Sequence, residues 1–358
     1  MRSVRVWLFL LAAICLVYPA TGWLNPVIAA EGKKAISERV STEEGKTQTT
    51  ATTEKGQQEE GEGRYEEIKE GECPATFGPI ITDTAIPMDK GRFALQPTWG
   101  LSFVTNTFSP SWRRIPAGGD FKSFGMSVKL TYGLLNNLEV YTVIPYIHNW
   151  ADRVEACGPN GERAADFGGL GDISLTFKYR LVQETQLAPT VSAIFTPIFP
   201  SGHFRPLNPG RLGTDATGGG TYAFTTGFNV SKYLKPFIFY GNLWYTFQTS
   251  YRTDEADEWG NTVERRNHPR DFVTINLAAE YPLTRKWVAL LELTSIWDGG
   301  RMVGPKANAQ PTALLSLLPG IEYMATEKFS LALGVNIGLY GKNNSANIIP
   351  ILSMVYAF

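Results

Sequence analysis

Bulky apolar residues alternate with small or polar ones from residue 91 to the carboxy terminus, in segments of about ten residues. The clearest segment runs from Phe329 to Tyr340. Its odd positions carry six large apolar side chains, and its even positions carry Ser, Ala, Gly or Asn as far as residue 338. Successive side chains of a strand point to opposite faces, so this period of two predicts β-strands. We expect an all-β fold over residues 91–358.

Twelve such segments follow one another along the chain. We expect strands over residues 92–107, 121–134, 138–150, 170–183, 190–200, 221–234, 237–251, 270–283, 286–298, 310–324, 328–341 and 346–358. The connections alternate between short turns and long polar loops, the latter near residues 109–120, 151–168, 202–219, 252–270 and 298–309. Transmembrane barrels have short periplasmic turns and long extracellular loops, whereas a soluble β-sandwich has no reason to keep that rhythm. The pattern predicts a closed antiparallel transmembrane β-barrel of about 12 strands.

The last strand ends in aromatic residues, Tyr356 and Phe358. Such an end is similar to the assembly signal of bacterial outer-membrane proteins, and we expect these two residues to have that role. Other aromatic residues cluster near strand ends, as interfacial girdles require. An even strand number would place both ends of the barrel on the periplasmic side.

Three segments precede the barrel. Residues 1–30 have a positively charged start, an apolar stretch from Val6 to Val17 and small residues before Glu31, as in a secretory signal peptide. Residues 31–72 contain 12 acidic and 7 basic residues and almost no aliphatic ones, which predicts a disordered acidic tether. Residues 73–90 form a pre-barrel segment that could enter the lumen as a plug. Export to the outer membrane follows from the signal peptide and the barrel.

Composition excludes one class of partner and leaves one covalent link open. The formal net charge is −1 and the pI is near 6.4, which argues against nucleic-acid binding. Beyond the signal peptide the chain has two cysteines, Cys73 and Cys157. They could form a disulfide in an oxidising compartment. Since one precedes the barrel and the other lies in an external loop, pairing would require the pre-barrel segment to enter the lumen; otherwise both are free thiols.

Charged residues on the non-lipid face of the strands are the candidate site. They are Lys129, Glu139, Asp172, Lys178, Arg180, Glu280, Glu292 and Glu322. A charge at the lipid midplane would cost a few kcal/mol, which favours an inward orientation. They could form a charged constriction that selects solutes, or a mutually neutralising set that fills a narrow barrel. A 12-stranded barrel lies between the filled eight-stranded and the open sixteen-stranded type, so both interpretations stay open.

Catalysis, metal binding and cofactors find little support in the sequence. His148, near Asp152, is the best candidate for a lipid-modifying barrel enzyme, but no serine is placed as its partner and no Gly-x-Ser-x-Gly motif occurs. No pair of residues has zinc-ligand spacing, and the acidic and basic loop at 252–270 lacks a calcium-binding register. We expect that loop to be solvated and to touch lipopolysaccharide. We expect no enzyme activity, metal or cofactor.

Several short motifs resemble those of a family of outer-membrane transporters named for the meta-cleavage pathway of phenol degradation. They include Gly169-Leu170-Gly171-Asp172-Ile173, Lys178-Tyr179-Arg180-Leu181, Ile81-Thr82-Asp83-Thr84, Gly91-Arg92-Phe93, Tyr132-Gly133-Leu134, Ile144-Pro145-Tyr146 and Pro200-Ser201-Gly202. Together they span about residues 80–358. The resemblance implies a barrel channel for small molecules, aromatic or apolar ones among them. The acidic segment 31–72 lies outside it.

Three functions follow as hypotheses. The first is a passive channel for small solutes, assembled by the outer-membrane machinery and surrounded by lipid and lipopolysaccharide. The second is a non-conducting scaffold that anchors an envelope complex through its tether, and the third is a lipid-modifying enzyme. Solute and oligomeric state stay open.

Overall fold

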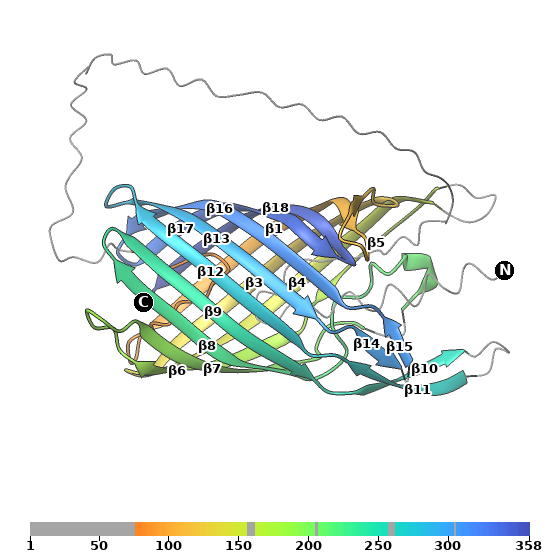
Figure 1. Ribbon diagram of the computed structural model, residues 1–358, viewed down its shortest axis with the longest axis horizontal. Helices are drawn as coiled ribbons and strands as arrows, with labels where there is room; N and C mark the ends of the chain where they lie inside the picture. Colours follow the sequence, from red (N-terminus) through yellow and green to blue (C-terminus); the bar gives the residue numbers. More distant parts are fainter. Residues whose placement is uncertain (1–75, 156–161, 205–206, 257–261, 304–305) are drawn as a thin grey trace, which may run out of the picture.

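The computed structural model describes residues 76–155, 162–204, 207–256, 262–303 and 306–358. They form one closed antiparallel β-barrel with strongly tilted strands (Figure 1). The predicted signal peptide, the acidic tether, Cys73 and Cys157 lie outside the described residues. Within the described part of the chain, no helix is long and apolar enough to cross a membrane.

Twelve strands make the barrel wall. They are β1 (Phe93–Phe108), β3 (Asp120–Leu135), β4 (Leu138–Glu155), β6 (Ile173–Val182), β7 (Thr190–Phe199), β8 (Ala223–Leu234), β9 (Phe237–Gln248), β12 (Phe272–Pro282), β13 (Trp287–Asp298), β16 (Thr312–Thr326), β17 (Phe329–Lys342) and β18 (Asn344–Ala357). Each pairs with its neighbours in this order, and β18 pairs with β1, with Trp99 opposite Leu352. Closure leaves no strand edge in contact with lipid, as a bilayer requires. The predicted barrel and all twelve predicted strands are confirmed.

Strand β9 shows the side-chain alternation most clearly. Phe239, Leu243 and Tyr245 are about half exposed, while Asn242 and Trp244 on the other face are almost fully buried. The exposed side chains face outward and form an apolar belt. Aromatic residues of this belt near strand ends include Tyr132, Tyr179, Tyr281, Trp287, Trp297 and Tyr356. A closed barrel with this outer surface is a transmembrane barrel.

The predicted alternation fails at one place in β17. Leu339 and Tyr340 are both exposed, although they are consecutive. Gly338 pairs with Ser316 and Tyr340 pairs with Leu315, so Leu339 is an extra residue in the ladder. Such a bulge turns two successive side chains to the same face, and a strict period of two cannot anticipate it.

The long connections differ from the loops that the sequence predicts. Near 151–168, β4 continues to Glu155 and pairs with β5 (Glu162–Leu170). Near 252–270 and 298–309, four short strands form a separate sheet beyond the wall: β10 (Tyr251–Ala256), β11 (Thr262–Pro269), β14 (Arg301–Val303) and β15 (Lys306–Ala309) (Figure 1). Arg252 pairs with Glu264 across this sheet at 2.8 Å. The sequence did not predict these strands because they lack apolar–polar alternation. Strands in water tolerate charges on both faces.

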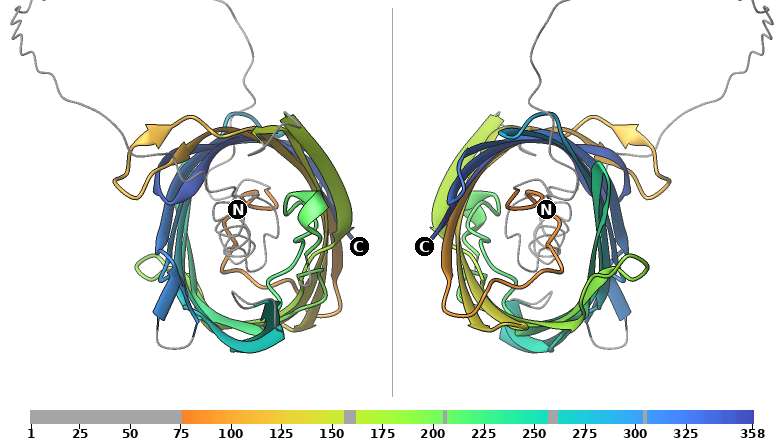
Figure 2. Two further views of the ribbon diagram at one scale, coloured as in Figure 1. Left: turned by 90° about the vertical axis from the view of Figure 1, so that its right-hand side faces the viewer. Right: turned by 90° about the vertical axis from the view of Figure 1, so that its left-hand side faces the viewer.

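Two further connections have little regular structure. Strand β2 (Arg114–Ile115) pairs with the end of β1 in the connection near 109–120. The connection between β7 and β8 contains one short 3-10 helix, η1 (Pro209–Arg211), and folds into the barrel mouth (Figure 2). Thr214, Asp215 and Thr217 of this connection are almost fully buried. The predicted long polar connection is therefore present here, but part of it is buried inside the barrel.

The outward face predicts a strong effect of charge. Leu277 lies near the middle of β12 with 51% of its surface exposed. We expect Leu277→Arg to lower the free energy of unfolding by about 2–4 kcal/mol, because the charge would face hydrocarbon. Unfolding by urea in lipid vesicles measures this. Leu187→Arg is the matched control: Leu187 is 97% exposed in the turn after β6 and should tolerate the charge. Equal effects of the two substitutions would contradict the outward orientation of Leu277.

Candidate functional site

Residues 76–88 run through the interior of the barrel before the chain enters β1 (Figure 2). This stretch, which we call the lumen segment, has no regular secondary structure. Pro79 and Pro87 lack the N–H groups that a strand would donate. The lumen segment carries one charged residue, Asp83.

Asp83 is the centre of a buried ionic network. Its carboxylate lies 3.0 Å from Lys178 Nζ on β6 and 3.3 Å from Lys129 Nζ on β3. Asn229 Nδ2 and the Tyr141 hydroxyl also donate to it, at 2.9 and 3.3 Å. Lys178, 1% exposed, pairs in addition with Glu139 at 3.1 Å. Two lysines and two carboxylates thus neutralise one another in a buried site, where an unpaired charge would be strongly destabilising.

The pKa of Asp83 reflects this arrangement. Burial by itself would raise the pKa, but the positive charges of Lys129 and Lys178 outweigh burial and hold it below the ordinary value of 3.8. Asp83 is therefore ionised at neutral pH.

A second group of charges lies across the lumen on β12, β13 and β16. Glu280, Glu292 and Glu322 are each at most 1% exposed. Glu292 accepts hydrogen bonds from the backbone N–H groups of Ile80 and Thr82, both at 2.7 Å. Glu322 accepts from the Thr76 hydroxyl at 2.7 Å, and Glu280 accepts from the Tyr240 hydroxyl at 2.9 Å. We call Glu280, Glu292 and Glu322 the acidic wall. Its carboxylates accept hydrogen bonds from N–H and O–H groups, most of them from the lumen segment.

The connection between β7 and β8 fills the other end of the barrel. The Asp172 carboxylate accepts from the N–H groups of Gly202 and Gly219 at 3.0 and 2.6 Å. Asn149 Nδ2 donates to the Thr214 carbonyl at 2.9 Å. A side chain at Gly218 would lie under 3.0 Å from the backbone of Gly202, so the two ends of this connection pass in close contact. Asp172 therefore holds the loop in the mouth.

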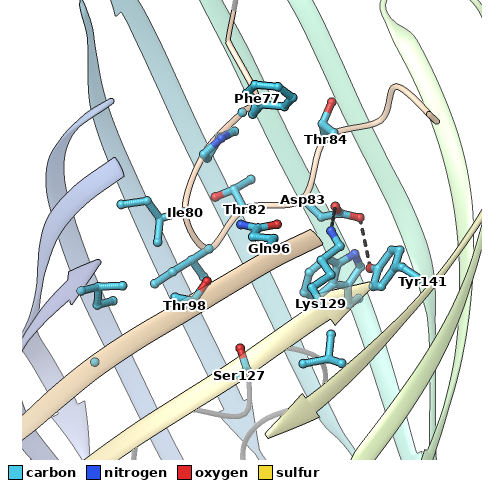
Figure 3. Close-up of a pocket in the computed structure, with 17 residues that line it drawn as sticks. Phe77, Ile80, Thr82, Asp83, Thr84, Gln96, Thr98, Ser127, Lys129 and Tyr141 are labelled. Atoms are coloured by element: carbon cyan, nitrogen blue, oxygen red, sulfur yellow. Dashed lines mark hydrogen bonds and ion pairs between the residues drawn. The ribbon is translucent and has the colours of Figure 1, made fainter. Parts of the chain in front are cut away.

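A cavity of about 110 Å³ remains between the lumen segment and the wall (Figure 3). Its apolar lining consists of Phe77, Ile80, Ile81, Val143, Trp244 and Ile351, together with the Tyr141 ring. Gln96, Thr98, Ser127 and Lys129 supply polar groups along one side. Lys129 Nζ lies 4.0 Å from the centre of the Tyr141 ring, within range of a cation–π interaction.

The structure brings together most of the predicted lumen charges, in two groups. Lys129, Glu139 and Lys178 meet through Asp83, whereas Glu280, Glu292 and Glu322 lie together on the opposite wall. Asp172 contacts the folded loop, and Arg180 donates to the Asn136 carbonyl at 3.0 Å in a turn. A functional role for these residues stays a prediction.

Sequence reasoning missed four polar residues of this site. Asp83 lies before the first strand, where period-two parity gives no orientation. Tyr141, Asn229 and Asn242 could have been found, because each has the inward parity of its strand and a polar group that hydrocarbon would not solvate.

His148 contacts an acidic residue other than the expected Asp152. Its Nε2 lies 3.1 Å from the Asp166 carboxylate of β5, and its ring stacks on Trp150 at 4.3 Å. No cluster of three or more His, Cys, Asp or Glu side chains is placed to hold a metal ion within the described ranges.

At the carboxy terminus, the Phe358 N–H donates to the Phe93 carbonyl of β1 at 2.8 Å. The rings of Tyr356 and Phe358 lie 4.6 Å apart. The assembly role of these two residues stays a prediction.

Comparison with known families identifies the chain. Residues 100–347 match the family model described as "Putative MetA-pathway of phenol degradation". The chain belongs to this family. The resemblance seen in the short motifs is thereby confirmed, and family and fold together place the protein in the outer membrane. No curated protein matches the sequence.

Several solved structures are similar to this chain at low sequence identity. The COG4313 outer membrane channel from Pseudomonas putida F1 is 14% identical with a TM-score of 0.59, over 82% of this chain and 100% of that one. The translocator domain of autotransporter NalP from Neisseria meningitidis is 12% identical with a TM-score of 0.42, over 75% of this chain and 88% of that one. The toluene transporter TbuX from Ralstonia pickettii is 9% identical with a TM-score of 0.37, over 76% of this chain and 90% of that one.

The ionic network predicts a large effect of removing one lysine. Lys178→Met would leave Asp83 and Glu139 with less compensation in a buried site, and we expect a loss of about 3–5 kcal/mol in the free energy of unfolding. Arg180→Ala, two residues along the same strand, should change it by less than about 1 kcal/mol because Arg180 is half-buried and contacts a turn carbonyl. Denaturant unfolding in vesicles compares the two. Similar losses would contradict the central place of Lys178.

Acid should weaken the Asp83 contacts in a defined range. A carboxyl whose pKa is lowered on folding stabilises the folded state above its unfolded pKa and stops doing so as the pH falls through its folded pKa. We expect the stability difference between wild type and Asp83→Asn to be constant from pH 7 to about pH 5 and to shrink below pH 3.8. A difference that grows on acidification would contradict this.

Proposed function

We propose that this protein is a passive outer-membrane channel for small solutes, aromatic or apolar ones among them. The observation that carries the proposal is the cavity beside the lumen segment inside a closed, polar-lined barrel. A scaffold would need only the outer wall. A passage needs interior space between its two mouths, and that space is present next to Lys129 and Tyr141.

The lining of the cavity favours small and largely apolar solutes. Phe77, Tyr141 and Trp244 offer ring surfaces, and Ile80 and Ile351 offer aliphatic ones. Polar groups of the wall and of the lumen segment lie among these surfaces, which suits a single ring bearing a hydroxyl or a similar group. The volume of about 110 Å³ is smaller than the ~150 Å³ of an engineered cavity that binds benzene. Passage of a ring therefore requires the lumen segment to shift.

The relatives are consistent with transport. The Pseudomonas putida protein that shares this fold is described as an outer membrane channel. We further propose that the protein is not an enzyme: His148 lies on the outer face of β4 within the aromatic girdle, and the contact described for it is with a half-exposed carboxylate.

A substitution that fills the cavity tests the proposal. Ser127 lines the cavity on β3, and its neighbour Val128 has the opposite, outward parity. We expect Ser127→Phe to reduce uptake of a labelled single-ring phenol by porin-depleted Gram-negative cells, whose lipopolysaccharide leaflet slows unaided diffusion. Val128→Phe, equal in bulk but on the lipid side, should leave uptake at the wild-type rate.

Two outcomes would contradict the channel. One is uptake in cells with the assembled wild-type barrel that does not exceed uptake in cells without it. That result would favour the scaffold hypothesis. The other is an equal effect of both phenylalanine substitutions, which would show that the cavity is not on the route.

A further inference from the structure

The lumen segment is bound by the barrel wall as a peptide ligand would be bound. Its backbone is held by side chains of the wall rather than by strand pairing. Glu292 accepts the N–H groups of Ile80, Ile81 and Thr82 within 2.7–3.2 Å. Further along, Ser231 Oγ accepts the Ala85 N–H at 2.8 Å, and Glu139 accepts the Met88 N–H at 2.7 Å.

One asparagine binds both main-chain polar groups of Asp83. Asn242 Oδ1 accepts the Asp83 N–H at 2.9 Å, while Asn242 Nδ2 donates to the Asp83 carbonyl at 2.7 Å. Asn242 is itself fixed by Asn229 and Asn276, at 3.0 and 3.2 Å. Such a two-way contact reads the backbone and not the side chain, so it selects an extended peptide of any sequence at this point.

Sequence selectivity comes from the Asp83 side chain. Lys129, Tyr141, Lys178 and Asn229 converge on its carboxylate from four strands, at 2.9–3.3 Å. Lys178 and Asn229 are almost completely buried. An uncharged residue in this position would leave both lysines short of a counter-charge. The preceding Ile80 and Ile81 pack on small apolar clusters that include Val288, Leu318 and Ile351.

We propose that the lumen wall is a recognition site for an extended peptide that carries an aspartate after an apolar pair. Residues 76–88 are its resident occupant, joined to the barrel through β1. Because the bonds are side chain to backbone, the occupant can leave without breaking the ladder of the barrel. Its departure opens the lumen and exposes the acidic wall of Glu280, Glu292 and Glu322. The inference rests on the same interior as the proposed function and supplies the shift that a ring requires.

The test uses the full chain with a weakened occupant. Asp83→Lys places a third positive charge beside Lys129 and Lys178, and we expect its single-channel conductance in planar bilayers to exceed that of the wild type. A synthetic peptide of residues 76–88, added from the side of the short turns, should return the current toward the wild-type level. The same peptide with Asp83→Asn should need at least about tenfold more for half-block, since a hydrogen bond to a charged group contributes at least about 1.4 kcal/mol.

The wild-type channel is the matched control. Its own segment is present at an effective concentration of about millimolar, so micromolar peptide should not change its current. Asp83→Asn, nearly identical in shape, replaces Asp83→Lys if that variant does not assemble. A protein-free bilayer with peptide excludes pores formed by the peptide itself.

Two results would overturn the inference. The first is an unchanged conductance in both Asp83 variants, which would show that the aspartate does not hold the occupant. The second is an open variant whose current the wild-type peptide does not lower. Failure of the proposed function has a different signature: phenol uptake would be absent while the peptide still blocks the ion current.

Discussion

The absence of hydrogen-bonding partners in lipid governs the whole structure. A strand that crosses hydrocarbon must satisfy every backbone group through its neighbours, so the sheet closes on itself, with β18 beside β1. Once closed, the sheet has one face to lipid and one to its own interior. The apolar face turns outward, and most of the buried polar side chains of the twelve strands face the lumen. The interior of this protein is therefore a polar core.

A polar core must be satisfied throughout, and the wall alone does not achieve this. Two segments with little regular structure supply further partners, one toward each end of the barrel. The lumen segment supplies Asp83 to the lysines on one wall and backbone N–H groups to the carboxylates on the other. The loop after β7 supplies backbone groups to Asp172 and Asn149. Residues such as Lys178 can be buried because their partners come from elsewhere in the chain.

This arrangement sets a conflict between stability and transport. The same contacts that neutralise buried charges narrow the passage to a cavity of about 110 Å³. Contacts between side chains and a backbone without ladder pairing are individually replaceable by water or by another peptide. The wall strands are held by their own ladder of hydrogen bonds, so the proposed departure of the lumen segment would leave the wall paired.

The sequence by itself determined the wall: twelve strands, their inward and outward faces, and the inward placement of Glu280, Glu292 and Glu322. Period-two alternation is a local property of the sequence. Turning a polar side chain toward lipid costs free energy, so the alternation predicts which face each residue occupies. Only the tertiary structure decided what fills the lumen. The conformations of residues 76–88 and 207–219 depend on side chains far away in the chain, and no strand periodicity in these segments predicts them. The pairing of Asp83 with Lys178, 95 residues apart, exists because the barrel closes around it.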